Sequence, residues 1–508
     1  MIRLVAMLLF GASALAQSIG LPWSGHAHDP QHTAMSHVAG APLERILWQT
    51  PVDLQPQYSG NELLIHYGSA LITRQNTVVI PVKTGASDGF RIEAHRATDG
   101  LLLWMLSSDY TLPTHNWTPQ YSIALTPKNR VYYAGAGGTV YFRDSPDSAS
   151  PPAGSTGQLA FYGMASYAAD PTTFNVNVKI NTPITSDRYG NIFFGYLVSG
   201  SVTLPGNVPL HSGIARIAED GTGTWVAAST AAADSSVIEL SYNQSPALSN
   251  DHRTLYVAVS RSDTSGLLLA LDSRTLTTTS QMALLDVLNP LTNARLLDDG
   301  TASPMVGPDG DVYFGVFENS WGSNHYRGWL RHFDKTLTQT KPAGAFGWDH
   351  TPSVVPAALV TSYHGSSKYL LLSKYNNYVT TGGDGVNHMA VLDPNDTMTD
   401  PVSGATVMKE ILTVAGVTPD TQYTSSFPNA VREWCVNTTA IDVLNHSAIL
   451  SSEDGKVYRW DFTSNTLGTP LTLTSGLGEA YTPTVIGVDG TVYAIANAIL
   501  FAIGRAGP

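Results

Sequence analysis

The chain has 508 residues, of which only 13% are charged, and it contains 45 glycines, 30 prolines and one cysteine. Turn-forming residues at this frequency predict short strands joined by tight turns rather than a helical protein. The formal net charge of −13 argues against nucleic acid and anionic lipid headgroups as partners. Because Cys435 is the single cysteine, an internal disulfide, an iron–sulfur cluster and a CxxCH haem site are excluded.

The N-terminus has the pattern of a secretory signal peptide. Arg3 precedes a short apolar run at residues 4–10, and Ala14 and Ala16 supply the small-x-small form that signal peptidase needs. The run is too short to span a bilayer. We expect residues 1–16 to be removed after Ala16, which leaves a periplasmic or extracellular protein that begins at Gln17 and does not insert into a membrane.

A leader segment, residues 17–44, precedes the repeats and is rich in histidine. Its imidazoles stand at short spacing, and such groups can chelate copper or zinc, so a metal-binding arm is one hypothesis for this segment. The histidines are His26, His28, His32 and His37.

One pattern returns eight times in the rest of the chain. A small polar residue, often in Thr-Pro or Ser-Pro, begins a short apolar stretch, and a turn and an aromatic-rich strand follow. The period of roughly 45 to 60 residues, with one longer gap between the sixth and seventh copies, is that of a four-stranded propeller blade. Asp-Gly pairs such as Asp309–Gly310 and Asp489–Gly490 are strong hairpin signals. We therefore predict an all-β fold for residues 45–508: a single β-propeller of eight four-stranded antiparallel blades, or of seven if the weak seventh copy belongs to its neighbour.

The last copy ends at Gly504, too early to supply an outer strand with the usual tryptophan. Residues 45–50, which include Trp48, look like such a strand without a sheet. Pairing them with the last copy, around residues 483–503, would close the ring and remove an exposed edge. We predict this N-terminal closure.

Several copies continue into a second pattern, in which an apolar strand ends on Ala or Asp and a Gly and a Trp follow. These copies resemble the blades of the PQQ-like propeller superfamily, which includes quinoprotein dehydrogenases and the outer-membrane assembly factor of the BAM complex. Trp23 and the run from His28 to Thr33 resemble the opening common in bacterial PQQ-repeat proteins. The resemblance covers nearly the whole chain, and it implies that the histidine-rich segment is a leader that covers the blades rather than a metal arm. The copies that carry it are residues 90–104, 267–275 and 456–461.

The dehydrogenases of that superfamily carry two adjacent cysteines over the quinone and hold calcium or a lanthanide between a Glu, an Asn and an Asp. One cysteine cannot form that ring, and no motif marks the metal ligands, so we predict no cofactor, with PQQ or calcium as the alternative. One polar loop suggests an oxygen cage for calcium, but it lacks a third ligand at the expected spacing and a central Gly, and we interpret it as a turn. Its residues are Asp393, Asn395, Asp396 and Asp400.

In a propeller, the residues just before each copy should ring one mouth of the central channel. A concave ring of amides, aromatic rings and a few ionisable groups suits a sugar or another small polar molecule. The alternative is that these groups satisfy one another and ordered water. The predicted ligand-binding residues are His66, Tyr67, Tyr121, Asn181, Asn243, Asp349, His350, Asn437, Glu479 and Tyr481, and no metal ligand is predicted.

No nucleophile elbow, zinc-protease helix or Walker loop occurs in the chain. The sequence therefore favours a binding or scaffold module that takes a small polar molecule, a glycan or a protein partner at the channel mouth. The alternative is a propeller enzyme, either a polysaccharide lyase or hydrolase or a divergent PQQ-type oxidoreductase. Replacing Asp349 or His350 by Ala should weaken binding at least tenfold, about 1.4 kcal/mol, with little change in stability, if these groups line a wet channel. The acid–base candidates of the enzyme hypothesis are Asp349, His350, Glu433 and Glu479.

Overall fold

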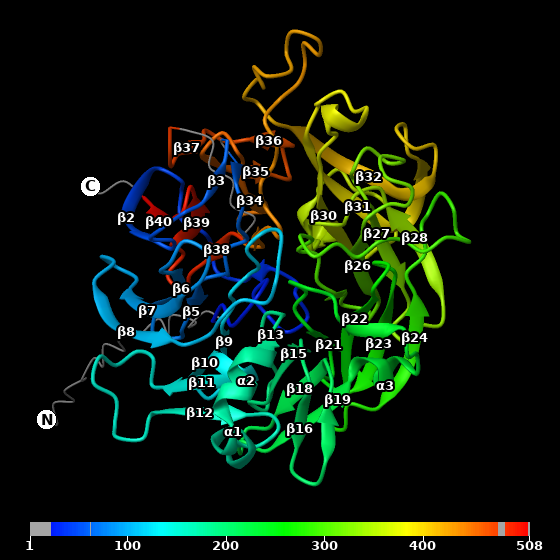
Figure 1. Ribbon diagram of the computed structural model, residues 1–508. Coiled ribbons are helices and arrows are strands. Elements are labelled where there is room, and N and C mark those ends of the chain that lie inside the picture. Colours follow the sequence, from blue (N-terminus) through cyan, green and yellow to red (C-terminus); the bar gives the residue numbers. More distant parts are fainter. Residues whose placement is uncertain (1–21, 61, 476–482, 506–508) are drawn as a thin grey trace, which may run out of the picture.

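Antiparallel sheets follow one another around a ring, so that the chain ends beside the strand with which the ring began (Figure 1). This computed structural model describes residues 22–60, 62–475 and 483–505. The predominantly β, propeller-like architecture predicted from the repeats is confirmed. The predicted signal peptide and its cleavage site lie outside the described residues.

The sheets are built from units of consecutive strands, numbered here along the chain. Unit 1 contains β5 (Leu71–Ile72), β6 (Thr77–Lys83), β7 (Phe90–Arg96) and β8 (Leu102–Ser108). Unit 2 contains β9 (Ala124–Leu125), β10 (Arg130–Ala134), β11 (Thr139–Asp144) and β12 (Thr156–Ala160). Unit 3 contains β13 (Val178–Ile180), β14 (Thr185–Ser186), β15 (Ile192–Val198), β18 (Gly213–Ile217) and β19 (Gly223–Ala227), and unit 4 contains β20 (Val237–Leu240), β21 (Ala247–Leu248), β22 (Thr254–Arg261), β23 (Gly266–Asp272) and β24 (Thr278–Ala283).

Units 5 and 6 touch through one parallel pair, Ala343 with Val407. Unit 5 contains β25 (Met305–Val306), β26 (Val312–Val316), β27 (Trp329–Phe333) and β28 (Thr340–Gly344), and unit 6 contains β29 (Ser353–Pro356), β30 (Tyr369–Tyr375), β31 (His388–Thr399) and β32 (Thr406–Ala415). Unit 7 contains β1 (Met35–Ser36), β33 (Ile441–Asp442), β34 (Ser447–Ser451), β35 (Lys456–Asp461), β36 (Thr466–Leu467) and β37 (Leu471–Thr472). Unit 8 contains β2 (Arg45–Pro51), β38 (Val485–Ile486), β39 (Val492–Ala496) and β40 (Ile499–Gly504).

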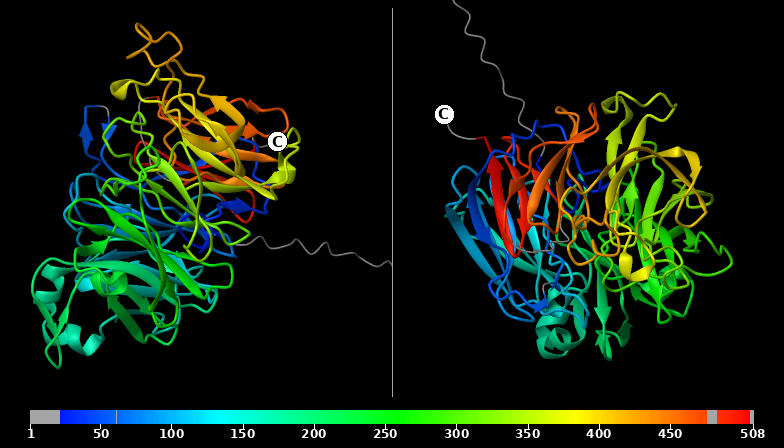
Figure 2. Two further views of the ribbon diagram at one scale, coloured as in Figure 1. Left: turned by 90° about the vertical axis from the view of Figure 1, so that its right-hand side faces the viewer. Right: turned by 90° about the horizontal axis from the view of Figure 1, so that it is seen from above.

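The remaining elements are small additions to these sheets. The segment between β32 and β33 stands out from the ring (Figures 1 and 2), and it accounts for much of the long gap between the sixth and seventh copies. None of the helices in the described residues has the length and apolar character needed to cross a membrane. The additions are the hairpins β3 (Tyr58–Ser59) with β4 (Glu62–Leu63) and β16 (Val202–Leu204) with β17 (Val208–Leu210), the helices α1 (Met164–Ala169), α2 (Pro171–Asn177) and α3 (Ala228–Ala232), and the 3-10 turns η1 (Ala136–Gly138), η2 (Ala357–Leu359) and η3 (Val379–Thr381).

The inner strands are apolar on both faces because each sheet packs between two neighbours. Every residue of β6 and of β30 is buried. One core cluster joins Val79 and Ile92 of unit 1 to Val131 of unit 2 and Ile192 of unit 3. Core burial of this extent is the main stabilising force available to a chain without disulfides.

The small polar residue at the start of each copy ties its unit to the unit before it. The Ser245 N–H donates to Ser303 Oγ at 2.8 Å, and the Ser303 N–H donates in turn to Thr351 Oγ1 at 2.9 Å. The Ala440 N–H donates to Thr484 Oγ1 at 2.9 Å. These amides are buried and precede the strand ladders, so they need a side-chain acceptor. The repeated Ser and Thr provide it.

The N-terminal closure occurs as predicted. β2 pairs antiparallel with β40 from Arg45 opposite Gly504 to Pro51 opposite Ile499. Trp48 is buried, and its indole Nε1–H donates to the Ala97 carbonyl at 2.6 Å. The chain therefore completes the sheet of its last repeat with its first long strand.

The leader runs across one end of the ring, where the innermost strands finish. Its backbone carbonyls accept hydrogen bonds from the inner strands of one unit after another, and we call this end of the channel the leader end. The bonds run from Ile72 to Trp23, Leu125 to Ser24, Leu248 to Pro30, Val306 to Gln31, Val354 to Thr33 and Ile441 to Ala34, at 2.7 to 3.0 Å.

The leader histidines serve as packing groups in this arrangement. The rings of His26 and His32 are buried and meet edge to face, with centroids 5.1 Å apart. His32 Nδ1 lies 2.6 Å from the Pro304 carbonyl, and burial lowers the pKa of His32 to about 4. These contacts favour the interpretation of the segment as a covering leader over the metal-arm hypothesis.

Candidate functional site

The opposite end of the channel, here called the mouth, brings together residues from units that are not neighbours in the ring. Asn116 Nδ2, between units 1 and 2, donates to both carboxylate oxygens of Asp298 at 3.2 Å, and Asp298 lies between units 4 and 5. Burial lowers the pKa of His66 in unit 1 to about 3, and the Lys374 ammonium of unit 6 contributes to the lowering. Contacts across the ring of this kind place these groups at the axis.

Asp349 and Lys374 form a buried ion pair at the base of the mouth. Asp349 Oδ2 lies 2.7 Å from Lys374 Nζ, and the two side chains are 4% and 0% exposed. The Asp349 backbone carbonyl is held by Thr301 Oγ1, which donates to it at 2.7 Å. Within the described residues, Asp349 Oδ1 accepts no hydrogen bond. Taking two charges out of water is costly, so this pair is poor evidence for stability and a candidate for function.

Half-buried carboxyl groups lie above this pair. Burial, with Asp298 and Asp349 nearby, raises the pKa of Asp299 to about 6. Burial and the neighbouring Asp298 raise the pKa of Glu239 to about 7. We refer to Glu239, Asp298 and Asp299 as the mouth carboxyls.

Aromatic side chains accompany the mouth carboxyls. The Trp117 ring is half-buried and stacks on His66 with centroids 5.4 Å apart. Trp348 precedes Asp349, is half-buried, and donates from Nε1 to the Tyr326 carbonyl at 2.7 Å. Tyr242 is half-buried beside Glu239 and Asp298, whose charges, after burial itself, raise its pKa. The mouth therefore combines carboxyl groups with aromatic faces.

The predicted amides lie at the mouth but bind mainly to its wall. The Gln120 N–H donates to Asn243 Oδ1 at 3.0 Å, and Asn243 Nδ2 donates to the Asp298 carbonyl at 3.0 Å. Asn181 Nδ2 donates to the Leu240 carbonyl at 3.0 Å. At Asn437 it is the backbone carbonyl that accepts, from the Thr351 N–H at 2.6 Å. The contacts of the Asn181 and Asn243 side chains match the alternative in which such groups satisfy one another.

Three other predicted residues point into the packing between units. Tyr67 Oη donates to Asp53 at 3.1 Å, and Tyr121 Oη donates to the Ala134 carbonyl at 2.7 Å. The His350 ring lies between Val436 and Leu372 carbonyls, 3.3 and 3.4 Å away. These positions do not bring the three side chains to the mouth.

The expected insensitivity of stability to Asp349 and His350 rests on a wet channel, and that premise is wrong. Asp349 is 3% exposed and His350 is fully buried, where desolvation lowers the histidine's pKa to about 3. A neutral imidazole held in the wall is a packing group. Of the other acid–base candidates, Glu433 is half-buried and, after burial itself, contributes with Asp349 to a raised Tyr378 pKa, and Glu479 and Tyr481 lie outside the described residues.

Sequence reasoning did not find Lys374, Asp299 or Glu239. The one signal for Lys374 is a lysine within β30, YLLLSKY, a strand that otherwise reads as fully buried. A lysine at such a position needs a partner. For Asp299 and Glu239 the sequence carries no comparable signal, because their proximity depends on how the loops of different units meet.

The polar loop of unit 6 is occupied by its own side-chain contacts. Asp400 pairs with Arg327 at 2.6 Å, and Asp396 pairs with Lys409 at 2.8 Å. Tyr363 and Ser367 each donate to Asp393 at 2.6 Å. Across the described ranges, no three His, Cys, Asp or Glu side chains are grouped so that they could hold a metal ion.

The raised carboxyl pKa values predict a pH dependence of folding. Asp299 and Glu239 ionise near pH 4 when unfolded but near pH 6 to 7 when folded, so the unfolded chain releases its protons first. Stability from these two groups is fully present below about pH 4 and is lost as the pH rises to about 7. The double variant D299N/E239Q should lack this loss.

Urea unfolding of the wild type and D299N/E239Q at several pH values measures the difference directly. The stability of the variant relative to the wild type should rise between about pH 4 and 7 and stay level above. Carboxyls elsewhere in the chain cancel in this difference. A difference that is independent of pH would contradict the raised pKa values.

The sequence matches no protein-family model and no curated protein. Among the solved structures that match the fold are three alcohol dehydrogenases. A europium-containing methanol dehydrogenase has a TM-score of 0.56 at 9% identity, over 93% of this chain and 88% of that one. A quinohemoprotein alcohol dehydrogenase from Comamonas testosteroni has 0.57 at 12%, over 97% and 82%. Another from Pseudomonas putida has 0.51 at 12%, over 96% and 76%.

Identities of 9% to 12% concern the shape of the chain and not its chemistry. The match runs through nearly the whole described ring and agrees with the blade pattern in the sequence. The chain shares the β-propeller fold of these dehydrogenases.

Proposed function

We propose that this chain is a binding module for a small, uncharged, hydroxyl-rich molecule such as a sugar, which enters at the mouth. The observation that carries the proposal is the grouping of Glu239, Asp298 and Asp299, with raised pKa values for two of them, beside half-buried aromatic rings. Carboxyl groups accept hydrogen bonds from hydroxyls, and aromatic faces pack against the carbon face of a sugar ring. A negatively charged ligand would be repelled by the same groups.

The buried pair below the mouth carboxyls supports this orientation. Asp349 Oδ1 lacks a donor within the described residues, so a ligand hydroxyl that reaches it would satisfy a buried acceptor. Each such bond to a charged group is worth about 1.5–3 kcal/mol, enough for specificity. Asp349 and Lys374 would thus recognise the ligand, and the mouth carboxyls and Trp117 would hold its outer part.

The described residues do not fit a metal-bound quinone. Cys435 is the only cysteine, so the pair of adjacent cysteines that those dehydrogenases carry over the quinone is missing, and no three His, Cys, Asp or Glu side chains of the described ranges are grouped so that they could hold a metal ion. Asp349, a carboxylate at the axis, is already paired with an ammonium group. The proposed function therefore does not involve PQQ.

The raised pKa values give a second candidate function, acid–base catalysis on the same ligand class. A carboxyl group with a pKa of about 6 or 7 can exchange protons near neutral pH. Hydrolysis or elimination within a glycan would then use Glu239 and Asp299 instead of the His350 and Glu433 expected from sequence. Product formation on the sugars that bind distinguishes the two functions.

The test is calorimetric titration of the exported protein with a panel of neutral mono- and oligosaccharides. We expect at least one to bind, and D299N and E239Q to weaken it at least tenfold, about 1.4 kcal/mol. Glu219→Gln is the matched control, because Glu219 is an exposed carboxylate paired with Lys128 on the surface. PQQ with calcium or a lanthanide, added in a separate arm, should neither bind nor support dye reduction.

Two results would overturn the proposal. One is that no neutral saccharide binds, and the other is that D299N and E239Q bind as tightly as E219Q. Because both mouth substitutions remove a desolvated negative charge, neither should lower stability, so lost binding would not reflect unfolding.

We also infer that the ring has eight blades. The eight units within the described ranges support this, together with separate sheets for unit 7 and for unit 8, which β2 completes. The seven-blade alternative would need β33 to β37 to join a neighbouring sheet. The matched dehydrogenases span most of this chain, which agrees with a ring of similar size.

A further inference from the structure

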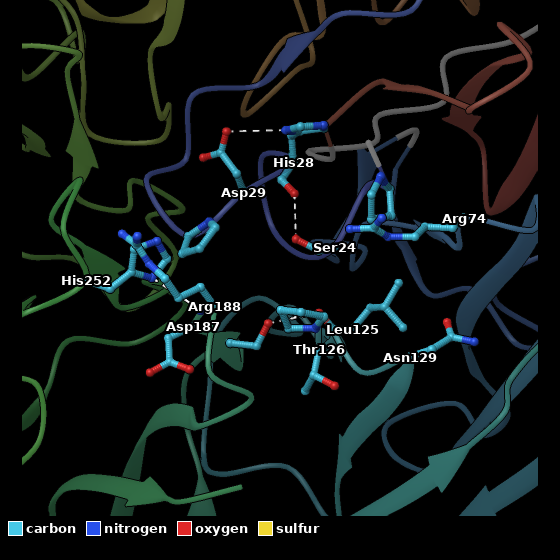
Figure 3. A pocket seen from close by; sticks show the side chains of 14 residues that line it. Ser24, His28, Asp29, Arg74, Leu125, Thr126, Asn129, Asp187, Arg188 and His252 are labelled. Carbon is cyan, nitrogen blue, oxygen red and sulfur yellow. Dashed lines mark hydrogen bonds and ion pairs between the residues drawn. The ribbon is translucent and has the colours of Figure 1, made fainter. Parts of the chain in front are cut away.

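A cavity of about 210 Å³ lies at the leader end, away from the mouth. The leader forms one wall, from Pro22 to Pro30, and turns that follow the innermost strands of units 1 to 4 form the others (Figure 3). The hydrogen bond from the Leu125 N–H to the Ser24 carbonyl, 2.8 Å, fixes two of these walls together. Ser24 Oγ also donates to the His28 carbonyl at 2.9 Å. The cavity is therefore a built part of the fold.

Its walls are largely apolar. The rings of Pro22, Pro30 and Pro127 and the side chain of Leu125 line it. The imidazole of His28 also faces it, held edge-on by Trp23 with ring centroids 4.8 Å apart. Such walls suit a flat apolar body.

Two arginines flank the cavity from opposite sides (Figure 3). Within the described part of the chain, the Arg74 guanidinium makes no hydrogen bond or ion pair, and Arg188 donates from Nη2 only to the Asn250 carbonyl, at 2.8 Å. In a chain of net charge −13, this cavity thus has two guanidinium groups that no carboxylate of the described residues pairs with. Both can form bidentate bonds with a carboxylate.

The two acidic side chains at the cavity are turned to their own loops. Asp187 Oδ1 accepts the N–H groups of Tyr189 and Asn191 at 2.8 and 2.9 Å. Asp29 accepts the N–H groups of Gln31 and Thr33, each at 3.1 Å. The two carboxylates therefore bind the backbone of their own loops and not the arginines, and the guanidinium groups of Arg74 and Arg188 are available to a ligand.

We propose that this cavity binds a small organic carboxylate with a flat apolar body, in the positive field of Arg74 and Arg188. At about 30 Å³ per water, the cavity corresponds to roughly seven waters, which fits an aromatic acid of benzoate size. The carboxylate lies at one of the two guanidinium groups, and the ring packs against the prolines and Leu125. This site is independent of the mouth and takes ligands of the opposite character.

Calorimetric titration of the exported protein with benzoate tests the proposal, with benzamide as the uncharged molecule of the same shape. We expect benzoate to bind with a dissociation constant of about 1 mM or tighter and benzamide at least tenfold more weakly. The double variant R74Q/R188Q should weaken benzoate binding at least tenfold and reduce its dependence on salt. Arg253→Gln, an exposed arginine beside His252 that does not line the cavity, should bind like the wild type.

Both cavity arginines are exposed, so R74Q/R188Q should keep its melting temperature, and a loss of binding cannot be ascribed to unfolding. The mouth variant D299N should keep benzoate binding, which separates this proposal from the proposed function. Absence of benzoate binding, equal binding of benzamide, or a double variant that binds like R253Q would each overturn the proposal.

Discussion

A protein that lacks residues 17–53 is expected to lose the folded ring rather than a dispensable tail. This deletion removes β2, and with it the outer partner of β40 along its whole length. The inner face of that strand pair holds Trp48, which is buried against Ala97. Loss of a buried tryptophan alone costs about 3–5 kcal/mol, a large part of a typical domain's stability of 5–15 kcal/mol.

The same deletion removes the leader, whose carbonyls accept hydrogen bonds from the inner strands of six units. Each of those buried N–H groups would be left without an acceptor, at about 1–3 kcal/mol where water cannot replace it. The backbone groups along the exposed edge of β40 would also be free to pair with strands of other molecules. We expect aggregation or a melting temperature far below that of the intact protein, measured by circular dichroism and size-exclusion chromatography.

Two smaller changes divide this effect. Trp48→Ala tests the closing strand, and deletion of residues 17–43 tests the leader while keeping β2. Each should lower the melting temperature, the combined deletion most. A truncated protein that begins at residue 54 and stays monomeric with an unchanged melting temperature would show that neither element closes the ring.

The repeat pattern predicted the ring because each copy carries its own physical requirement. A buried strand start needs a hydroxyl acceptor, which is why Ser303, Thr351 and Thr484 recur at the same place in their units. The Asp-Gly turns are equally local, since Gly310 and Gly490 have φ of +94° and +87°, a region that favours glycine. Such local requirements fix the residue type at a position, so they can be recognised in the sequence.

The site was less predictable because it depends on contacts between distant loops. Position before a repeat selected Asp349, which pairs with Lys374, and equally His350, Tyr67 and Tyr121, whose side chains turn into the packing. Successive side chains of a strand point to opposite faces, so a shift of one position along the strand exchanges a side chain that faces the channel for one that faces the wall. The period of the repeat, known only to within a residue or two, cannot decide between them.

The path of the leader has a similar explanation. Its histidines suggested a metal arm because spacing is what a sequence shows, whereas in the structure they are packing groups, and the rings of His26 and His32 meet edge to face. His32 contacts the Pro304 carbonyl, and His28 lies beside Asp29 at 3.3 Å. Most of the leader's contacts with the ring are made by backbone carbonyls. Because every residue type has this group, the sequence does not show which positions make the contacts.

Breaking the Asp349–Lys374 pair from one side is expected to destabilise the protein by about 3–5 kcal/mol, because the remaining charge stays buried without its partner. Asp349→Asn leaves the ammonium, and Lys374→Met leaves the carboxylate, in a site where both side chains are almost fully buried. The double variant D349N/K374M removes both charges and should recover most of the loss. Free energies of unfolding from urea titrations give the coupling between the two residues.

Two control pairs give this result its meaning. Asp53 and Lys83 form a second buried pair, in which Lys83 Nζ also donates to the Gln55, Gly85 and Ala86 carbonyls. D53N/K83M should therefore leave those carbonyls unsatisfied and recover only part of its loss. The exposed pair Arg96 and Asp99 should matter far less in either form. If D349N/K374M is also less stable than both single variants, the pair is a structural element of the fold. Recovery together with loss of saccharide binding would mean that the two charges are kept for recognition at a cost in stability.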